Sequence, residues 1–271
     1  MIAKIIGGGK MGMIYAEKCC INSLISHVFI EDINPKNALE SPVYNKYSNK
    51  ISVNKDCDDA DFVIICTPPK DHINQIRYYS HFNIPMLVEK PVVSSLNEIN
   101  DIPSSSYSNI IVGYCERYNK DLERLKDCKF IRFQRLGKTP NSNHGVDVNL
   151  DLSVHDIDLA RFVLEEDPLE IRSYNVGFGR NYSTCNIDLV FSNHIVNIDS
   201  SYFSYDHVKP KRFAYGKLKN DDCFNLDLNQ KIDKIALQLN DFINFVKTKN
   251  SGRLPILDDG IKSLKIALGE L

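Results

Sequence analysis

A glycine-rich stretch, Gly7-Gly8-Gly9-Lys10-Met11-Gly12, decides the fold expected for this chain of 271 residues. An apolar run at residues 2–6 precedes it and a mostly apolar stretch follows it, which predicts a strand, a tight loop and a helix. Gly7, Gly9 and Gly12 match the pattern G-x-G-x-x-G. In that pattern the first glycine permits the turn, the second lets the backbone approach a pyrophosphate, and the third lets helix pack on strand. A glycine turn that binds no ligand is the alternative.

A second predicted strand, residues 27–30, ends in Glu31-Asp32. Asp32 follows the glycines at the distance where an acid accepts hydrogen bonds from the ribose hydroxyls of a dinucleotide. A carboxylate there would repel a 2′-phosphate, so NAD is favoured over NADP; the alternative is an acid that only caps the strand. Since the N–H groups at the helix start can receive phosphate charge, the candidate cofactor-binding residues here are Gly7, Gly9, Lys10, Met11, Gly12 and Asp32.

Further short apolar runs alternate with helical patterns and predict strands at residues 51–53, 62–66, 84–88 and 109–112. This alternation is typical of a doubly wound parallel sheet. The run at 84–88 ends in Glu89-Lys90-Pro91, and the proline keeps Lys90 out of the helical region. In such a sheet ligands bind outside the carboxyl ends of the strands, so Gly7, Asp32, Thr67 and Lys90 are expected along one edge.

The composition is that of an ordinary globular protein, with 43% hydrophobic and 25% charged residues. A formal net charge of −2 gives no electrostatic footprint for nucleic acid or for an anionic membrane. The eight cysteines show no C-x-x-C spacing, and we expect reduced thiols. Neither a signal peptide nor an apolar run of spanning length is evident. These features predict a soluble cytoplasmic protein.

The second half of the chain predicts a different architecture. Residues 129–136 alternate as a strand that opens a new sheet, and residues 170–178, 184–191, 195–203 and 212–218 have the pattern of an antiparallel meander. Residues 232–246 have the period of a core-facing helix. We therefore expect an α/β chain: an N-terminal Rossmann domain at 1–115 and, at 116–271, an α+β domain for substrate binding and oligomerisation, with a mostly antiparallel open sheet.

A polar helix face is predicted where Asp151, His155 and Asp158 are spaced i, i+4 and i+7. A central imidazole suits general acid–base work, because its ordinary pKa of about 6.5 lets it exchange a proton at working pH. An exposed, capped helix start is the alternative; without a further ligand cluster no metal is expected. The loop at 137–149, with Lys138, Asn141, Asn143, His144 and Asp147, is either solvated or closes over a polyol.

Four motifs in order carry a family resemblance: the glycine fingerprint; Cys66-Thr67-Pro68-Pro69 with His72; Glu89-Lys90-Pro91; and the stretch 112–119, Val-Gly-Tyr-Cys-Glu-Arg-Tyr-Asn. Together with Asp151, His155 and Asp158 they resemble the Gfo/Idh/MocA family of glucose–fructose oxidoreductase and inositol dehydrogenase relatives. The resemblance implies that Lys90 lies beside the nicotinamide and the substrate hydroxyl. It further implies that Thr67, Pro68 and His72 form a loop around the cofactor.

The same resemblance makes Asp151 and His155 the substrate-binding and catalytic pair, with Asp158 in support. It also suggests a cis bond before Pro91. Glu89, grouped with the cofactor-binding residues, either anchors the lysine or only supports the turn. One departure is that the family has several glycines before the first aspartate and another at the position of Ser153, so the substrate side of the pocket is expected to differ.

The resulting hypothesis is an NAD-dependent oxidoreductase that transfers a hydride between nicotinamide and a secondary alcohol or ketone of a sugar, polyol or sugar nucleotide. Its catalytic residues would be Lys90, His155 and Asp151. The alternatives are a non-catalytic NAD-binding regulatory protein of the same fold, and a reductase of a non-sugar substrate. From the resemblance alone we also expect a homodimer or homotetramer formed through the C-terminal sheet.

Overall fold

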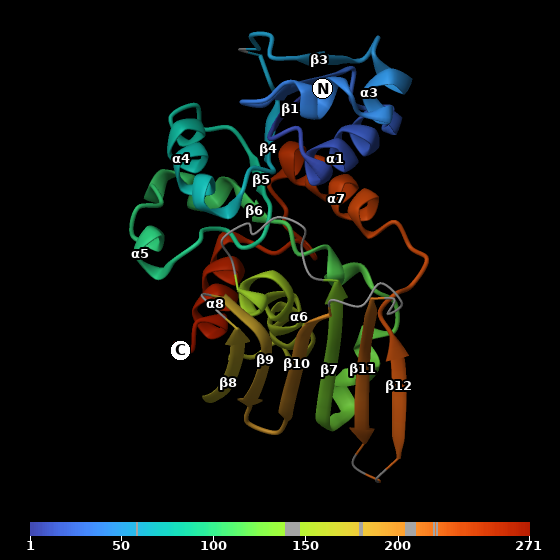
Figure 1. The fold of residues 1–271 in the computed structure, drawn as a ribbon, viewed down its shortest axis with the longest axis vertical. Coiled ribbons are helices and arrows are strands. Elements are labelled where there is room, and N and C mark those ends of the chain that lie inside the picture. The colour runs from blue at the N-terminus through green and yellow to red at the C-terminus, as the bar shows by residue number, and fades with distance from the viewer. Residues whose placement is uncertain (58, 139–146, 179–180, 204–209, 219, 221) are drawn as a thin grey trace. The chain divides into compact units, whose positions relative to one another are not determined.

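The computed structural model describes the chain except for residues 58, 139–146, 179–180, 204–209, 219 and 221. Two compact units make up the fold (Figure 1). The first comprises Met1–Cys115 and Asp233–Asp258, and the second comprises Glu116–Ile232 and Asp259–Leu271. Each unit is built on its own six-stranded sheet.

The sheet of the first unit is parallel throughout, with the order β3-β2-β1-β4-β5-β6. This doubly wound order confirms the predicted Rossmann fold, and it reverses direction between β1 and β4, where such sheets bind dinucleotides. The strands are β1 (Ile2–Ile6), β2 (His27–Glu31), β3 (Ile51–Val53), β4 (Phe62–Ile65), β5 (Met86–Val88) and β6 (Ile110–Val112).

Burial on both faces of the sheet explains why the sequences of these strands are uninterrupted apolar runs. All four residues of β4 and all three of β5 are wholly inaccessible to solvent, as expected for a sheet covered on both faces. The helices of this unit are α1 (Lys10–Ile21), α2 (Lys36–Leu39), α3 (Pro42–Tyr47), α4 (Pro69–Ser80), α5 (Leu96–Ile99) and α7 (Lys234–Thr248), with a 3-10 turn at Ser104–Asn109.

Helix α7 belongs to the first unit, although the sequence analysis placed residues 116–271 together in the second domain. Its side chains Leu239, Phe242, Ile243 and Phe245 are buried in the core of the parallel sheet. The rings of Phe242 and Phe62 meet edge to face, with centroids 5.4 Å apart. The apolar face of α7 is therefore buried in the core formed by the N-terminal part of the chain.

The sheet of the second unit has the order β12-β11-β7-β10-β9-β8. Strands β7 and β10 are parallel and the other neighbours antiparallel, which confirms a mostly antiparallel sheet. The expected meander holds for β8, β9 and β10. It is wrong for β11, which pairs with the other edge of β7. The strands are β7 (Cys128–Lys138), β8 (Glu170–Phe178), β9 (Asn181–Val190), β10 (Ile195–Phe203), β11 (Lys211–Leu218) and β12 (Cys223–Asp227).

One face of this second sheet is buried against helix α6 (Val154–Leu164), since Arg135 of β7 contacts Asp156 of α6. The inward residues Ile131, Phe133 and Ile198 are fully buried. The unit is completed by α8 (Leu257–Ala267), whose first two residues belong to the other unit, by 3-10 turns at Cys115–Tyr118 and Leu122–Asp127, and by a π-helical turn at Asn149–Ser153.

We predict that Phe242→Ala destabilises the first unit by about 3–5 kcal/mol, because it removes a fully buried ring packed on Phe62. Leu237→Ala on the same helix, at a side chain that is 41% exposed, is the matched control and should change stability by no more than about 0.5 kcal/mol. Denaturant unfolding monitored by circular dichroism measures both. Equal effects of the two substitutions would contradict the packing described for α7.

Candidate active site

The glycine loop is held by close backbone contacts that exclude side chains. Gly7 has φ +97°, and a Cβ there would lie 2.7 Å from the carbonyl oxygen of Cys66. A Cβ at Gly12 would lie 1.8 Å from the carbonyl oxygen of Gly7. Both positions therefore require glycine, and α1 begins directly against the end of β1.

Gly9 differs from the other two, because nothing lies within 4 Å of where its Cβ would stand. Helix α1 starts beside it without a side-chain cap and without an acidic residue in its first turn. Its first backbone hydrogen bond joins Met13 N to Gly9 O at 2.9 Å, so the preceding N–H groups have no partner inside the helix. Such a helix start binds phosphate well, and the geometry fits a dinucleotide.

A pocket of about 460 Å³ adjoins the loop. Its walls come from the start of α1 and from the segment after β2. The backbone N–H groups of the helix start therefore lie in the same pocket as the neutral polar side chains of Asn37 and Ser41. The lining residues are Gly8, Gly9, Lys10, Met13, Ile14, Glu17, Asn37, Ser41 and Val43.

Asp32 lies at the end of β2 and supports the glycine loop. Its carboxylate accepts hydrogen bonds from Gly8 N (2.6 Å) and Asn34 N (2.7 Å), and Asn37 Nδ2 lies 3.3 Å from Oδ1. The side chain is half-buried, so it combines this local role with access for a ligand hydroxyl.

The ends of the strands meet along one edge of the parallel sheet, as the sequence analysis expected. Backbone hydrogen bonds join Gly7 N to Glu31 O (2.8 Å), Cys66 N to Ile6 O (2.7 Å) and Glu89 N to Ile65 O (2.9 Å). Lys90 follows at this edge, half-buried, and the Lys90–Pro91 peptide is cis.

His72 lies in the first turns of α4 and is fully buried. Its Nε2 is 2.8 Å from the carbonyl oxygen of Thr67 and its Nδ1 is 2.9 Å from that of Pro91. Burial lowers the pKa of the His72 imidazole, against these backbone contacts, which raise it. The ring thus joins the Thr67–Pro68 loop to the peptide after Lys90, and both its nitrogens face backbone oxygens.

In the second unit, Asp151 lies in the π-helical turn and His155 in the first turn of α6; both are half-buried. Tyr202 of β10 donates a hydrogen bond from its hydroxyl to Asp151 Oδ2 at 2.7 Å. Burial and the Asp151 carboxylate raise the pKa of Tyr202. Sequence reasoning missed Tyr202, since this contact depends on how β10 packs against the π-helical turn.

Asp158 does not share the polar face expected with Asp151 and His155. It is fully buried, and its carboxylate receives Arg117 Nε at 2.8 Å and Nη2 at 2.6 Å. Burial raises the pKa of Asp158 and the Arg117 guanidinium opposes that rise. The expected polar face is wrong for two reasons. The π-helical turn at Asn149–Ser153 changes the angle between successive side chains around the helix axis, and Asp158 is buried in an ion pair with Arg117. The loop expected at 137–149 lies outside the described residues from 139 to 146.

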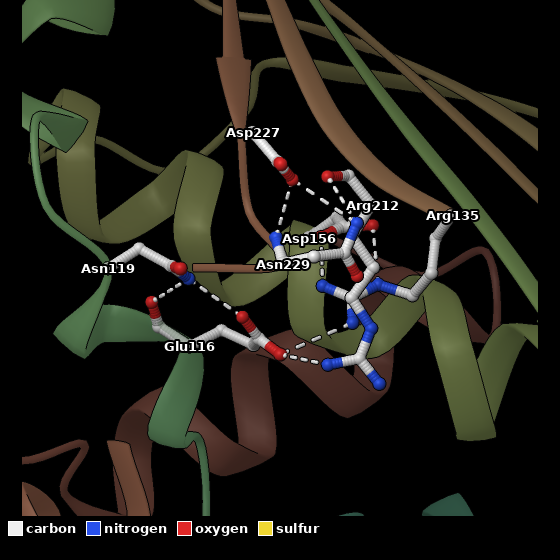
Figure 2. Close-up of polar contacts among 7 residues, drawn as sticks. All are labelled: Glu116, Asn119, Arg135, Asp156, Arg212, Asp227 and Asn229. Atoms are coloured by element: carbon white, nitrogen blue, oxygen red, sulfur yellow. Dashed lines mark hydrogen bonds and ion pairs between the residues drawn. The ribbon is translucent and has the colours of Figure 1, made fainter. Parts of the chain in front are cut away.

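A second network of buried ion pairs includes Asp156, the residue that follows His155 in the chain. Arg135 Nε and Nη2 donate to the two oxygens of Asp156 at 2.9 and 2.6 Å, and both residues are 1% exposed. Figure 2 shows Glu116 beside this pair, bonded to Arg212 Nη1 at 2.7 Å and to Asn119 Nδ2 at 2.7 Å. Two arginine–aspartate pairs therefore fix α6, the helix that carries His155.

In the part of the chain that the structure describes, no group of three or more His, Cys, Asp or Glu side chains could hold a metal ion. None of the described helices has both the length and the apolar character needed to cross a membrane.

The doubly wound sheet and its glycine loop define a dinucleotide-binding protein of Rossmann type. Residues 3–105 match the model of the GFO_IDH_MocA oxidoreductase family, described as an NAD-binding Rossmann fold. This match confirms the resemblance over residues 3–105, the part of the chain that contains the glycine loop and the Glu89-Lys90-Pro91 motif.

Curated relatives extend the match into the second unit. UDP-N-acetylglucosamine 3-dehydrogenase of Acidithiobacillus ferrooxidans is 23% identical over 180 residues, which cover 64% of this chain and 57% of that enzyme. Inositol 2-dehydrogenase of Rhizobium meliloti is 24% identical over 186 residues, which cover 62% and 56%. The matched part thus spans less than two thirds of either relative.

Solved structures share the fold over the whole chain. GenD2 from gentamicin A biosynthesis, in complex with NAD, has a TM-score of 0.85 and 14% identity, and the match covers 100% of this chain and 93% of GenD2. UDP-N-acetylglucosamine 3-dehydrogenase GnnA from Acidithiobacillus ferrooxidans has a TM-score of 0.84 and 20% identity, and the match covers 99% of this chain and 95% of GnnA. At this identity the likeness concerns the fold.

We predict that Asp156→Ala destabilises the second unit by about 3–5 kcal/mol, because it leaves the Arg135 guanidinium buried without its bidentate partner. Replacing both partners, as Arg135→Met with Asp156→Leu, should recover most of this loss. Arg172→Ala, which breaks an exposed pair with Glu170, is the control and should cost at most about 1 kcal/mol. Thermal and denaturant unfolding test the set. A double variant no more stable than Asp156→Ala would contradict the account.

Proposed function

We propose that this protein is an NAD-dependent dehydrogenase that acts on a secondary alcohol of a sugar, polyol or sugar nucleotide. The observation that carries the proposal is the edge of the parallel sheet, where the phosphate-binding loop at β1 and Lys90 after β5 flank the end of β4. The match of residues 3–105 to an NAD-binding oxidoreductase family supports the same chemistry.

The cofactor would be held by the residues whose geometry fits it. The glycine loop and the first N–H groups of α1, from Lys10 and Met11 onward, would bind the pyrophosphate, and Asp32 would accept the ribose hydroxyls. When bound, NAD supplies the hydride acceptor of the reaction. Thr67, Pro68 and His72 would shape the loop on the nicotinamide side, with His72 acting through the backbone it contacts.

The remaining chemistry falls to three side chains. Lys90 would polarise the substrate oxygen, since an ammonium stabilises a developing alkoxide. His155 would exchange the hydroxyl proton, which an imidazole can take and return near neutral pH. Asp151, held by Tyr202, would orient the substrate or the imidazole.

The substrate class is inferred from the relatives, which are named for a sugar nucleotide and for inositol. A dehydrogenase of such substrates needs neutral and charged polar groups around several hydroxyls, and Asp151, His155 and Tyr202 supply them in the second unit.

Oligomer formation through the outer face of the second sheet is part of the proposal. That face carries exposed aromatic and aliphatic side chains, including Phe130, Tyr174, Val176 and Tyr215, among polar pairs such as Arg132 with Asp199. An exposed sheet face of this kind favours association with a second copy of the chain. We place the protein in the cytoplasm, in keeping with the reduced thiols expected from the spacing of its eight cysteines.

Separate variants Lys90→Met and His155→Asn test the reaction. Each should lower kcat by about 10²-fold or more, while NADH binding, measured by fluorescence, stays near wild type. The assay is NADH formation from NAD with a panel of sugars, polyols and sugar nucleotides that includes inositol and UDP-N-acetylglucosamine. Lys247→Met and His81→Asn, at exposed positions, are matched controls and should retain full activity. Undiminished turnover in both site variants would sink the mechanism, and NAD binding without turnover of any compound would favour the regulatory alternative.

Cofactor preference has its own test. We predict that NADH binds at least about tenfold more tightly than NADPH, a difference of about 1.4 kcal/mol, because the Asp32 carboxylate repels a 2′-phosphate. Asp32→Asn keeps an acceptor for Gly8 N but removes the negative charge, so it should reduce the difference in affinity between NADH and NADPH. Dissociation constants from fluorescence titration decide the matter; tighter binding of NADPH by the wild-type protein would refute the role given to Asp32.

A further inference from the structure

The short strand β3 is followed by an asparagine whose side chain bonds Asp32, the residue after β2. Strand β3 pairs in parallel with β2 from Ile51 to Val53, and Asn54 N then donates to the carbonyl oxygen of Ile30 at 2.8 Å. Asn54 has φ 47°, in the left-handed region that asparagine tolerates better than most residues. The regular pairing ends there, and the Asn54 carboxamide lies beside the main chain of Asp32.

The Asn54 carboxamide bonds the peptide groups on both sides of Asp32. Its Oδ1 accepts a hydrogen bond from Asp32 N, and its Nδ2 donates to Asp32 O, both at 2.9 Å. An asparagine side chain can do this because its planar amide holds an acceptor and a donor side by side. A rotation about either main-chain dihedral angle of Asp32 would lengthen at least one of the two bonds, so the contact fixes the main chain at this residue.

The carboxylate of Asp32 is bonded to the glycine loop. Gly8 N donates to Oδ2 at 2.6 Å, and Asn34 N donates to Oδ1 at 2.7 Å. Asn37 Nδ2 is farther away, 3.3 Å from Oδ1 and 3.5 Å from Oδ2. An ionised carboxylate has about four acceptor positions, so the two short bonds leave positions for the hydroxyls of a ribose. Gly8 and Asn37 also line the pocket of about 460 Å³, which places the carboxylate at its border.

The contacts of the main chain and of the carboxylate of Asp32 depend on each other, because only a methylene group separates them. A shift of the main chain moves Oδ2 relative to Gly8 N. It also moves the negative charge relative to a nucleotide in the pocket. Since the repulsion between two charges depends on their distance, this shift would change how strongly a 2′-phosphate is disfavoured.

We propose that Asn54 is a positioning residue for cofactor selection: by holding both peptide groups of Asp32, it keeps the carboxylate bonded to the glycine loop and directed at the ribose of the dinucleotide. The part that concerns the dinucleotide rests on the proposed function. The part that concerns Asp32 can be measured on the protein without any nucleotide.

Asn54→Gly tests the hold on Asp32, because it removes the carboxamide and leaves a residue that adopts a positive φ without strain. The readout is amide hydrogen exchange of the full ¹⁵N-labelled chain without nucleotide. Exchange at Asp32 N and at Gly8 N should become faster by about threefold or more, the effect of losing one ordinary hydrogen bond. Gly8 carries the test, since its N–H is bonded to the Asp32 carboxylate and responds only if that group moves.

Asn83→Gly is the matched control. Asn83 is exposed like Asn54, has φ 51°, and accepts a hydrogen bond at Oδ1 from Asn109 Nδ2 at 2.6 Å. It precedes β5 and so lies at the opposite edge of the parallel sheet from Asp32. This variant should leave exchange at Gly8 unchanged. Unchanged exchange at Gly8 in Asn54→Gly would overturn the proposal, even if Asp32 N exchanged faster.

Dissociation constants for NADH and NADPH test the role in cofactor selection. Asn54→Gly should reduce the preference for NADH by about threefold or more. In an Asp32→Asn background the same substitution should have no further effect, because the charge that Asn54 positions is gone. Independent effects of the two substitutions on the preference would overturn the role in selection. Faster exchange at Gly8 in a protein that binds neither nucleotide would uphold the hold on Asp32 and refute the proposed function.

Discussion

The close approach of α1 to the end of β1 is the constraint on which the first unit depends. A Cβ at Gly12 would stand 1.8 Å from the carbonyl oxygen of Gly7, and a Cβ at Gly7 would stand 2.7 Å from that of Cys66, so the helix can take this position only with glycine at both places. The position of α1 then determines two things at once. Its start offers N–H groups for phosphate, and its second turn carries Tyr15, whose hydroxyl bonds Glu89, the residue before Lys90. The uncapped helix start and the contact between Tyr15 and Glu89 thus belong to one helix.

The second unit fixes its candidate catalytic helix by a different means. Asp156 and Asp158 of α6 are both buried and each receives a bidentate arginine, Arg135 and Arg117. Buried pairs of this kind contribute little net stability, but losing one partner is costly, so they hold a helix in one orientation. His155 and Asp151 are left half-buried beside them. Of the three aspartates near His155 in the sequence, Asp156 and Asp158 therefore hold the helix in place, and Asp151 is left as the candidate for a catalytic role.

Local patterns were enough to predict the parallel sheet, its glycine loop and the common edge of Gly7, Asp32, Thr67 and Lys90, because each depends on a strand and the turn after it. Contacts between distant segments could not be predicted. The apolar stripe of α7 does not reveal which core it joins, and the spacing of Asp158 does not reveal Arg117. Tyr202 meets Asp151 only because β10 packs against the π-helical turn. The roles of Lys90, His155 and Asp151 stay predictions.

The central claim is that a hydride passes from a carbinol carbon to NAD under the control of this chain. The most direct measurement is mass spectrometry of the reduced cofactor after incubation of the protein and NAD with sugars, polyols and sugar nucleotides deuterated at their carbinol carbons. The account predicts NADH that carries one deuterium with at least one of these compounds. A protein that binds NAD and yields no deuterated NADH from any of them would contradict it.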